Sequence, residues 1–170
     1  MDIRTYIRDI QDFPKKGITF KDITPLLQSP EALRYTTNAL YELTKDLKID
    51  KVVGIESRGF LFGTSLAAQL DAGFVPVRKP GKLPYATLSE TYALEYGTDT
   101  LEVHTDAITP GERVLIHDDV LATGGTANAV CKLVERSGGI IVQCNFLIEL
   151  SFLNGRQGLE NYQIRSLISY

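Results

Sequence analysis

The sequence has few residues that could cross-link a fold. Its 170 residues include only two cysteines, Cys131 and Cys144. Tryptophan is also absent. Two isolated cysteines are too few for a disulfide framework or a zinc site, and their apolar neighbours favour buried thiols that pack as small hydrophobic groups. A chain of this length buries roughly 70% of its unfolded surface. A hydrophobic core can therefore stabilise it without covalent or metal cross-links.

Long hydrophobic runs and an excess of positive charge are also missing. The apolar stretches 59–70 and 137–148 are shorter than the roughly 20 residues that cross a bilayer, and residues 1–13 lack the apolar segment of a secretory signal. The 18 Lys and Arg residues against 21 Asp and Glu give a formal charge of −3. Nucleic-acid binding requires neutralisation of many phosphates, so a chain with net negative charge is not expected to bind nucleic acid. Without a spanning run or a signal segment, we expect a cytoplasmic protein that does not bind membranes. A local site for a small anion is not excluded.

The hydrophobic pattern alternates between strand and helix. Uniformly apolar strands are expected at 52–55, 74–77, 114–116 and 140–148, and helices at 59–70 and 126–136. Strands without polar alternation are buried on both faces, as in a parallel sheet covered by helices. We therefore predict an α/β fold over residues 1–170: a single doubly wound domain with a central, mostly parallel sheet flanked by helices.

Three other segments complete the fold prediction. Apolar residues at positions 3, 7 and 10 indicate an N-terminal helix over 3–10. Ser29 followed by Pro30 indicates the start of another helix, because serine caps helices and proline suits their first position. The polar, Thr- and Tyr-rich segment from Arg78 to Asp106 is strand-like. It indicates an inserted β-hairpin that forms a lid.

The most informative residues follow the apolar strand 114–116. Asp118 and Asp119 are followed by the loop ATGGT at 122–126. Its glycines let the backbone approach a ligand, and consecutive N–H groups at a helix start bind anions. Carboxylates repel phosphate, so their partners are sugar hydroxyls or a Mg²⁺ carried by the ligand. The segment predicts a ribose 5-phosphate site, with an ordinary turn and helix cap as the alternative.

Two further strand ends carry polar groups. The strand 52–55 is followed by Glu56-Ser57-Arg58-Gly59, where an arginine at a helix start suits a diphosphate. The alternative is a surface ion pair between Arg58 and Glu56. The strand 74–77 is followed by a concentrated positive patch, made of Arg78, Lys79 and Lys82. A solvated basic turn is the usual explanation of such a patch, but its place after a strand favours an anionic substrate.

The segment VLIHDDVLATGGTA resembles the phosphoribosyl-diphosphate motif of type I phosphoribosyltransferases. The resemblance implies that Asp118 and Asp119 bind the ribose hydroxyls. It implies that the 5-phosphate is bound by Ala122, Thr123, Gly124, Gly125 and Thr126. It also implies that Mg²⁺ is bound through the substrate, with no metal ligand supplied directly by the protein.

Three other segments resemble adenine phosphoribosyltransferases in particular. SRGFLFG at 57–63 resembles their diphosphate loop, in which the peptide before the serine is often cis. LEYG at 94–97 resembles the tip of their lid, here about residues 80–105, where Tyr96 would cover the reacting centre. GITFKDI at 17–23 resembles the base-binding part of their hood, here about residues 1–28.

The same resemblance implies a role for each remaining site residue. Arg58 and Glu95 are expected to be catalytic, with Glu95 a candidate for proton transfer. The base would be bound by Phe20, which stacks on it, and by the backbone of Thr19 and Lys21. The diphosphate would be bound by Ser57, Arg58, Arg78, Lys79 and Lys82, some of them supplied across the interface of a homodimer.

The implied activity is transfer of phosphoribose from 5-phosphoribosyl 1-diphosphate to adenine, which gives AMP and diphosphate in purine salvage. The alternatives are a type I transferase for another base and a non-catalytic phosphoribosyl-diphosphate sensor. His117 departs from the family pattern, which has an apolar residue there. We predict a neutral core histidine bonded to a neighbour, because the preceding strand must be buried; the alternative is a contact with the ribose side. His104 is expected on the surface of a strand.

Overall fold

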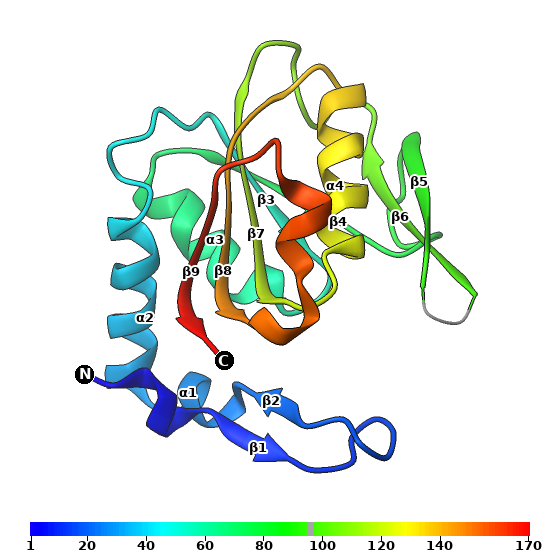
Figure 1. Ribbon diagram of the computed structural model, residues 1–170. Helices are drawn as coiled ribbons and strands as arrows, with labels where there is room; N and C mark the ends of the chain where they lie inside the picture. Colours follow the sequence, from blue (N-terminus) through cyan, green and yellow to red (C-terminus); the bar gives the residue numbers. More distant parts are fainter. Residues whose placement is uncertain (95–96) are drawn as a thin grey trace. The chain divides into compact units, whose positions relative to one another are not determined.

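The computed structural model describes residues 1–94 and 97–170 (Figure 1). The chain divides into two compact units, Met1–Ala39 and Leu40–Tyr170. The first unit carries the segment predicted as the hood, and the second carries the predicted strands and the ATGGT loop. No helix in the two described stretches is long and apolar enough to cross a membrane.

A five-stranded parallel sheet forms the centre of the second unit. The strands lie in the order β4-β3-β7-β8-β9, and every neighbouring pair is parallel. Their bounds are β3 Lys51–Ile55, β4 Gly73–Val77, β7 Arg113–Leu121, β8 Ile140–Glu149 and β9 Ile164–Ser169. The central strands are mostly buried, which is why their sequences lack polar alternation.

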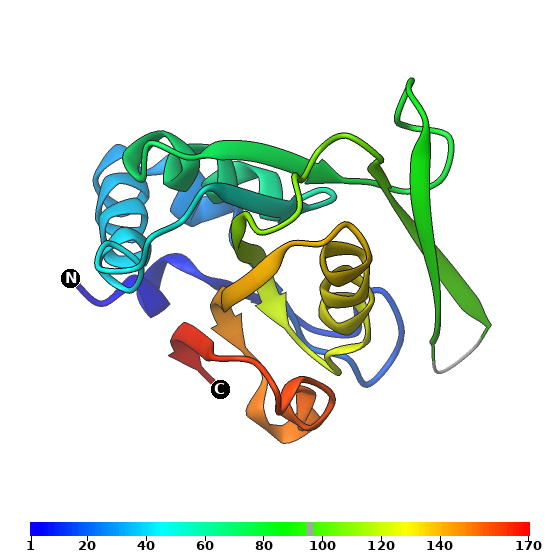
Figure 2. The same ribbon diagram turned by 90° about the horizontal axis from the view of Figure 1, so that it is seen from above.

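Helices cover both faces of this sheet (Figure 2). On β7, Val114 and Ile116 belong to the same core cluster as Val130 of α4 (Gly125–Arg136). His117 points to the opposite face, where its ring meets Phe62 of α3 (Gly59–Gln69) edge-on at 6.4 Å. Successive residues of a strand face opposite sides of a sheet, so the two helices cover opposite faces. The predicted doubly wound α/β fold is confirmed.

The predicted antiparallel hairpin is present in the second unit. It consists of β5 Thr87–Ala93 and β6 Thr98–His104, which pair antiparallel. Leu101 and Val103 of β6 are buried in the core cluster, and Arg136 of α4 donates to the backbone oxygen of Ser89 at 2.7 Å. These residues anchor the hairpin to the core and to α4.

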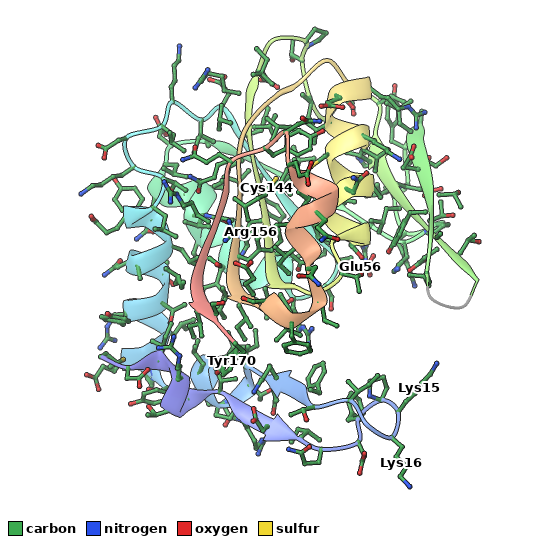
Figure 3. All side chains as sticks on the ribbon, viewed as in Figure 1. Lys15, Lys16, Glu56, Cys144, Arg156 and Tyr170 are labelled. Atoms are coloured by element: carbon green, nitrogen blue, oxygen red, sulfur yellow. The ribbon has the colours of Figure 1, made fainter. Side chains whose placement is uncertain are left out.

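The predicted helix over residues 3–10 is wrong. The structure has a 3₁₀ turn, η1 (Ile3–Tyr6), and then a strand, β1 (Arg8–Ile10), which pairs with β2 (Phe20–Asp22). Ion pairs across the strands, from Arg8 to Asp22 at 2.6 Å and from Lys21 to Asp9 at 2.7 Å, accompany this pairing. Lys15 and Lys16 extend outward from the loop between these strands (Figure 3). The helical spacing of apolar residues over 3–10 predicted the wrong structure because residues 8–10 pair with β2, which lies about ten positions later in the sequence.

Two short helices complete the first unit, and the sequence indicated only the second of them. α1 runs over Thr24–Gln28, and α2 begins at Pro30 and ends at Glu42, beyond the boundary between the units. The Ser29 hydroxyl accepts a hydrogen bond from the backbone N–H of Ala32 at 3.3 Å. The predicted serine cap with proline at the first helical position is confirmed.

The strand that carries the acidic pair is longer than the predicted 114–116. β7 continues to Leu121 because its pairing with β8 continues, with Asp118 opposite Phe146 and Val120 opposite Ile148. Asp118 and Asp119 therefore lie within the strand and not after it. Beyond β8 the sequence pattern also missed two 3₁₀ turns, η2 (Ser151–Leu153) and η3 (Gly155–Leu159), and the last strand, β9.

Candidate active site

Polar side chains surround a cavity of about 450 Å³ in the second unit. It lies where β3, β4 and β7 end, the edge at which ligands bind in open α/β sheets. Tyr92 and Asp99 of the hairpin complete its wall. Six of the predicted site residues line it: Ser57, Arg58, Lys79, Asp118, Asp119 and Thr126.

Asp119 is buried, Asp118 is half-buried, and the pair is short of partners. Burial raises the pKa of Asp118 well above its usual range, and the neighbouring charge of Asp119 raises it further. Burial also raises the pKa of Asp119, partly offset by Arg58, whose Nε lies 2.6 Å from Asp119 Oδ2. No described residue donates an aligned hydrogen bond to that buried oxygen. A ligand with hydroxyl donors would supply what the pair lacks.

The predicted 5-phosphate loop surrounds a smaller cavity of about 70 Å³. Ala122, Thr123 and Gly124 line it, and Asp118 and Thr126 border both cavities. Gly124 has φ +84°, a left-handed conformation that glycine adopts without strain. It precedes α4, so the N–H groups of the first helical turn begin directly after the loop. The loop therefore has the geometry of an anion site at a helix start.

The opposite wall is built from ion pairs. Arg78 donates to both oxygens of Glu56, at 3.3 and 3.1 Å, and lowers the pKa of that carboxyl. Glu56 also accepts from the backbone N–H of Lys79 at 2.8 Å, while the ammonium group of Lys79 pairs with Asp99. The Glu56–Ser57 peptide is cis, as the resemblance implied. Arg58 pairs with Asp119 across the cavity, which the alternative of a surface pair with Glu56 did not foresee.

Some predicted site residues lie elsewhere. Lys82 is exposed, and its backbone oxygen accepts from Arg78 at 3.4 Å. Thr19, Phe20 and Lys21 belong to the first unit, where Phe20 packs edge-on against Phe13 at 5.2 Å between ring centres. Glu95 and Tyr96 fall outside the described residues.

Tyr92 and Asp99 are site residues that the sequence did not reveal. They face each other across the hairpin, and the Tyr92 hydroxyl lies 3.3 Å from Asp99 Oδ2 and 3.2 Å from the hydroxyl of Thr126. Through these contacts the hairpin joins Lys79 to the start of α4. Only the register of the hairpin could have identified them from the sequence, because pairing residues 87–93 with 98–104 places Tyr92 opposite Asp99.

The histidines and cysteines behave largely as expected. His117 is fully buried, its Nδ1 lies 2.7 Å from Asn145 Oδ1, and burial lowers its pKa to about 4, so it is neutral at pH 7. His104 lies at the end of β6, where it is half-buried and its Nε2 accepts from the backbone of Tyr85. Cys131 and Cys144 are buried free thiols, although their sulfurs are only 3.8 Å apart.

Comparison with known proteins agrees with this geometry. Residues 22–161 match the family model described as the phosphoribosyl transferase domain. The adenine phosphoribosyltransferase of Christiangramia forsetii is 62% identical over 170 residues, which cover 100% of this chain and 99% of that one.

Solved structures give the same result. The crystal structure of adenine phosphoribosyltransferase from Rhodothermus marinus is 59% identical, with a TM-score of 0.94 over 99% of this chain and 96% of that one. The enzyme from Saccharomyces cerevisiae, complexed with an imino-altritol bisphosphate and adenine, is 42% identical, with a TM-score of 0.92 over 98% and 96%. The chain belongs to the phosphoribosyl transferase domain family and, within it, to the adenine phosphoribosyltransferases.

Proposed function

We propose that the chain transfers phosphoribose from 5-phosphoribosyl 1-diphosphate to adenine within the cavity of the second unit. The observation that carries this proposal is the acidic pair beside the glycine loop, with Asp119 buried. Its acceptor Asp119 Oδ2 has no aligned hydrogen-bond donor among the described residues, and cations line the facing wall. A sugar with free hydroxyls, a phosphate at one end and a diphosphate at the other satisfies all three features.

Different residues bind the ribose, the 5-phosphate and the diphosphate. Asp118 and Asp119 accept hydrogen bonds from the ribose hydroxyls, which fixes the sugar. The loop 122–126 binds the 5-phosphate through backbone N–H groups and the hydroxyls of Thr123 and Thr126. With both held, the bond from the sugar to the diphosphate points toward Arg58 and Lys79, which line the same cavity.

Breaking that bond builds positive charge on the sugar and negative charge on the diphosphate. Arg58 and Lys79 stabilise the departing oxygens, because preorganised positive charges act most strongly where negative charge develops. Ser57 adds a hydrogen-bond donor beside them. The carboxylates of the acidic pair lie on the sugar side, where they stabilise the cationic centre. Adenine then attacks the sugar carbon, so no covalent nucleophile of the protein is required.

Mg²⁺ carried by the substrate fits this arrangement. Carboxylate oxygens bind Mg²⁺ or accept hydrogen bonds from its waters, and Asp119 Oδ2 has acceptor capacity left. Carried by the substrate, the ion would neutralise charge on the diphosphate. The protein's own groups would hold the complex by accepting from its hydroxyls and waters.

The base site and the lid follow from the family resemblance. We propose that Phe20 stacks on adenine and that the backbone of Thr19 and Lys21 binds its edge. Glu95 would transfer a proton to or from the base. Tyr96 would cover the reacting centre and so exclude water that would otherwise attack the sugar.

A homodimer in the cytoplasm is part of the same proposal. Arg78 lies behind the cavity wall, paired with Glu56, and Lys82 is exposed; the family resemblance implies that part of this segment contacts a partner's diphosphate. Two thiols that stay free at a 3.8 Å separation suit a reducing compartment. Sedimentation of the purified protein tests the dimer.

An assay of the purified protein with phosphoribosyl diphosphate, Mg²⁺ and one base at a time tests the function. We expect AMP and diphosphate with adenine, and much slower reaction with guanine or hypoxanthine. Product with guanine or hypoxanthine alone would assign the chain to another base. Tight binding of phosphoribosyl diphosphate without turnover of any base would support the sensor alternative.

A further inference from the structure

A glycine far from the sequence motif supports the 5-phosphate loop. Gly155, the first residue of η3, is buried behind residues 121–124. A Cβ built on Gly155 would overlap the backbone oxygen of Ala122, and a Cβ built on Gly124 would overlap the backbone oxygen of Gly155. The two backbones therefore pack against each other with no room for a side chain on either.

Hydrogen bonds hold the two segments together on either side of this contact. The backbone N–H of Leu150 donates to the oxygen of Leu121 at 2.9 Å. Beyond Gly155, the amide of Asn128 in α4 donates to the backbone oxygen of Gly158. η3 is thus joined to the strand before the loop and to the helix after it.

An ion pair fixes η3 to the sheet. Arg156 donates to both carboxylate oxygens of Glu149, at 2.6 Å each, and Ser166 of β9 donates to the same carboxylate at 2.7 Å. Glu149 is the last residue of β8, and its side chain is 10% exposed. Such a bidentate, partly buried pair restrains position more than an exposed single contact does. Arg156, labelled in Figure 3, therefore holds the turn that lies behind the loop.

We propose that Gly155 is a positioning residue for the 5-phosphate loop, held in place by the Arg156–Glu149 pair. The inference rests on the proposed function, because it takes loop 122–126 as the 5-phosphate site. Backbone N–H groups bind an anion well only when their direction is fixed, and a misplacement of about 1 Å can cost roughly a hundredfold in rate. The loop's carbonyls and N–H groups cannot shift toward η3 while the two backbones are in contact.

The chain offers a matched control in the same turn. Gly158 is exposed, and the nearest atom to a Cβ built there is the Asn128 amide nitrogen at 3.6 Å, an ordinary contact. Neither Gly155 nor Gly158 has the left-handed backbone that disfavours alanine. Gly155→Ala and Gly158→Ala therefore add the same methyl group at positions three residues apart. The first methyl overlaps the loop, and the second makes only an ordinary contact with Asn128.

Calorimetric titration of both variants and the unmodified protein with ribose 5-phosphate, and separately with inorganic diphosphate, tests the inference. We expect Gly155→Ala to weaken ribose 5-phosphate binding and raise the KM for phosphoribosyl diphosphate, each by about tenfold. Diphosphate binding and the KM for adenine should stay within about twofold, because those groups contact other segments. Gly158→Ala should change none of these values by more than about twofold.

Unchanged ribose 5-phosphate binding in folded Gly155→Ala would overturn the inference, and so would equal weakening of ribose 5-phosphate and diphosphate. If Gly155→Ala does not fold, Arg156→Met decides, because it loosens η3 without adding atoms against the loop. We then expect a smaller loss of ribose 5-phosphate affinity, again with diphosphate binding unchanged; no selective loss would overturn the inference. Failure of the unmodified protein to convert adenine would contradict the proposed function instead, and the two failures are separable.

Discussion

The two ends of the cavity are built differently. At the end proposed for the ribose and its phosphate, backbone contacts hold the acidic pair and the glycine loop: β7 pairs with β8, and Gly124 packs on Gly155. At the diphosphate end, side chains hold one another: the Lys79 ammonium group pairs with Asp99, and Arg78 pairs with Glu56. Lys79 and Asp99 are partly exposed, at 41% and 29% of their side-chain surface, while Asp119 is 4% exposed.

The difference matches what each end has to do in the proposed reaction. The phosphoribosyl group stays at one end while its bond to the diphosphate is exchanged for a bond to the base, so a rigid backbone site suits the chemical step. The diphosphate must bind and then leave, so its cations need another partner when it is gone. Asp99 supplies that partner for Lys79. We therefore expect changes at the first end to abolish activity and changes at the second to shift binding and release.

The largest effect is expected from removing the charges of the acidic pair. Asp118→Asn with Asp119→Asn should lower kcat/KM by about a thousandfold or more, since groups aimed at developing charge contribute about a hundredfold to a thousandfold each. The folded-state pKa of each aspartate is raised, mainly by burial. The charged forms therefore destabilise the fold at pH 7, so the variant should melt at an equal or higher temperature.

Steady-state kinetics and thermal melting followed by circular dichroism measure both effects. Because a raised pKa means that these groups favour the folded state only while protonated, the stability gain should shrink as the pH falls below the folded-state pKa values. Full activity in the double variant would refute the ribose assignment. A lower melting temperature at pH 7 would show that the pair has stabilising partners.

A second test breaks the backbone contact at the same end. Gly124→Ala combines a left-handed φ of +84° with overlap on the Gly155 oxygen, so we expect loss of about a hundredfold in kcat/KM. Gly111→Ala is the control: it has φ +90° and nothing within 4 Å of the added carbon. That variant should lose about 1 kcal/mol of stability and no activity. Equal activity losses in the two would show that backbone strain, and not the contact, is responsible.

The sequence reveals the first end of the cavity better than the second. Asp118, Asp119 and the loop 122–126 are contiguous and follow a buried strand, so a single segment carries their chemistry. Arg58 and Lys79 follow two different strands and Asp99 lies in strand β6, so their pairing depends on how β3, β4 and the hairpin meet. Sequence reasoning found both cations and Asp119, but it missed Asp99 and did not foresee either ion pair. Opposite charges distant in the sequence are not linked by any local pattern.

Gly155 shows the same limit at the ribose-phosphate end. Its requirement for glycine comes from a contact with residues about thirty positions earlier, and the turn around it has no helical or strand periodicity. The parallel strands were predictable because burial on both faces leaves a uniform apolar sequence. The N-terminal strand β1 was mistaken for a helix because three apolar positions in eight residues fit a helix by chance.

At the diphosphate end, Lys79→Ala should give an intermediate effect. Loss of one cation facing the diphosphate should raise the KM for phosphoribosyl diphosphate by about tenfold and weaken its dependence on salt, because screening acts on the charge that was removed. Lys79→Arg should retain most of the affinity. The KM measured at low and high ionic strength checks this, and an unchanged salt dependence would contradict a direct charge contact.

Asp99→Asn is expected to have the smallest effect, a change in diphosphate affinity whose direction distinguishes two roles for Asp99. If Asp99 only holds Lys79 in place, the substitution weakens diphosphate binding. If Asp99 competes with diphosphate for Lys79, as the exchange of partners requires, the substitution tightens product binding by about two- to threefold, a size typical of a partly exposed pair. Product inhibition by diphosphate then strengthens and release slows. Tyr92→Phe is the control, because it removes the hydroxyl beside Asp99 without removing a charge. Weaker inhibition by diphosphate in Asp99→Asn would show that the ion pair orients Lys79, and that the two ends of the cavity are both preorganised.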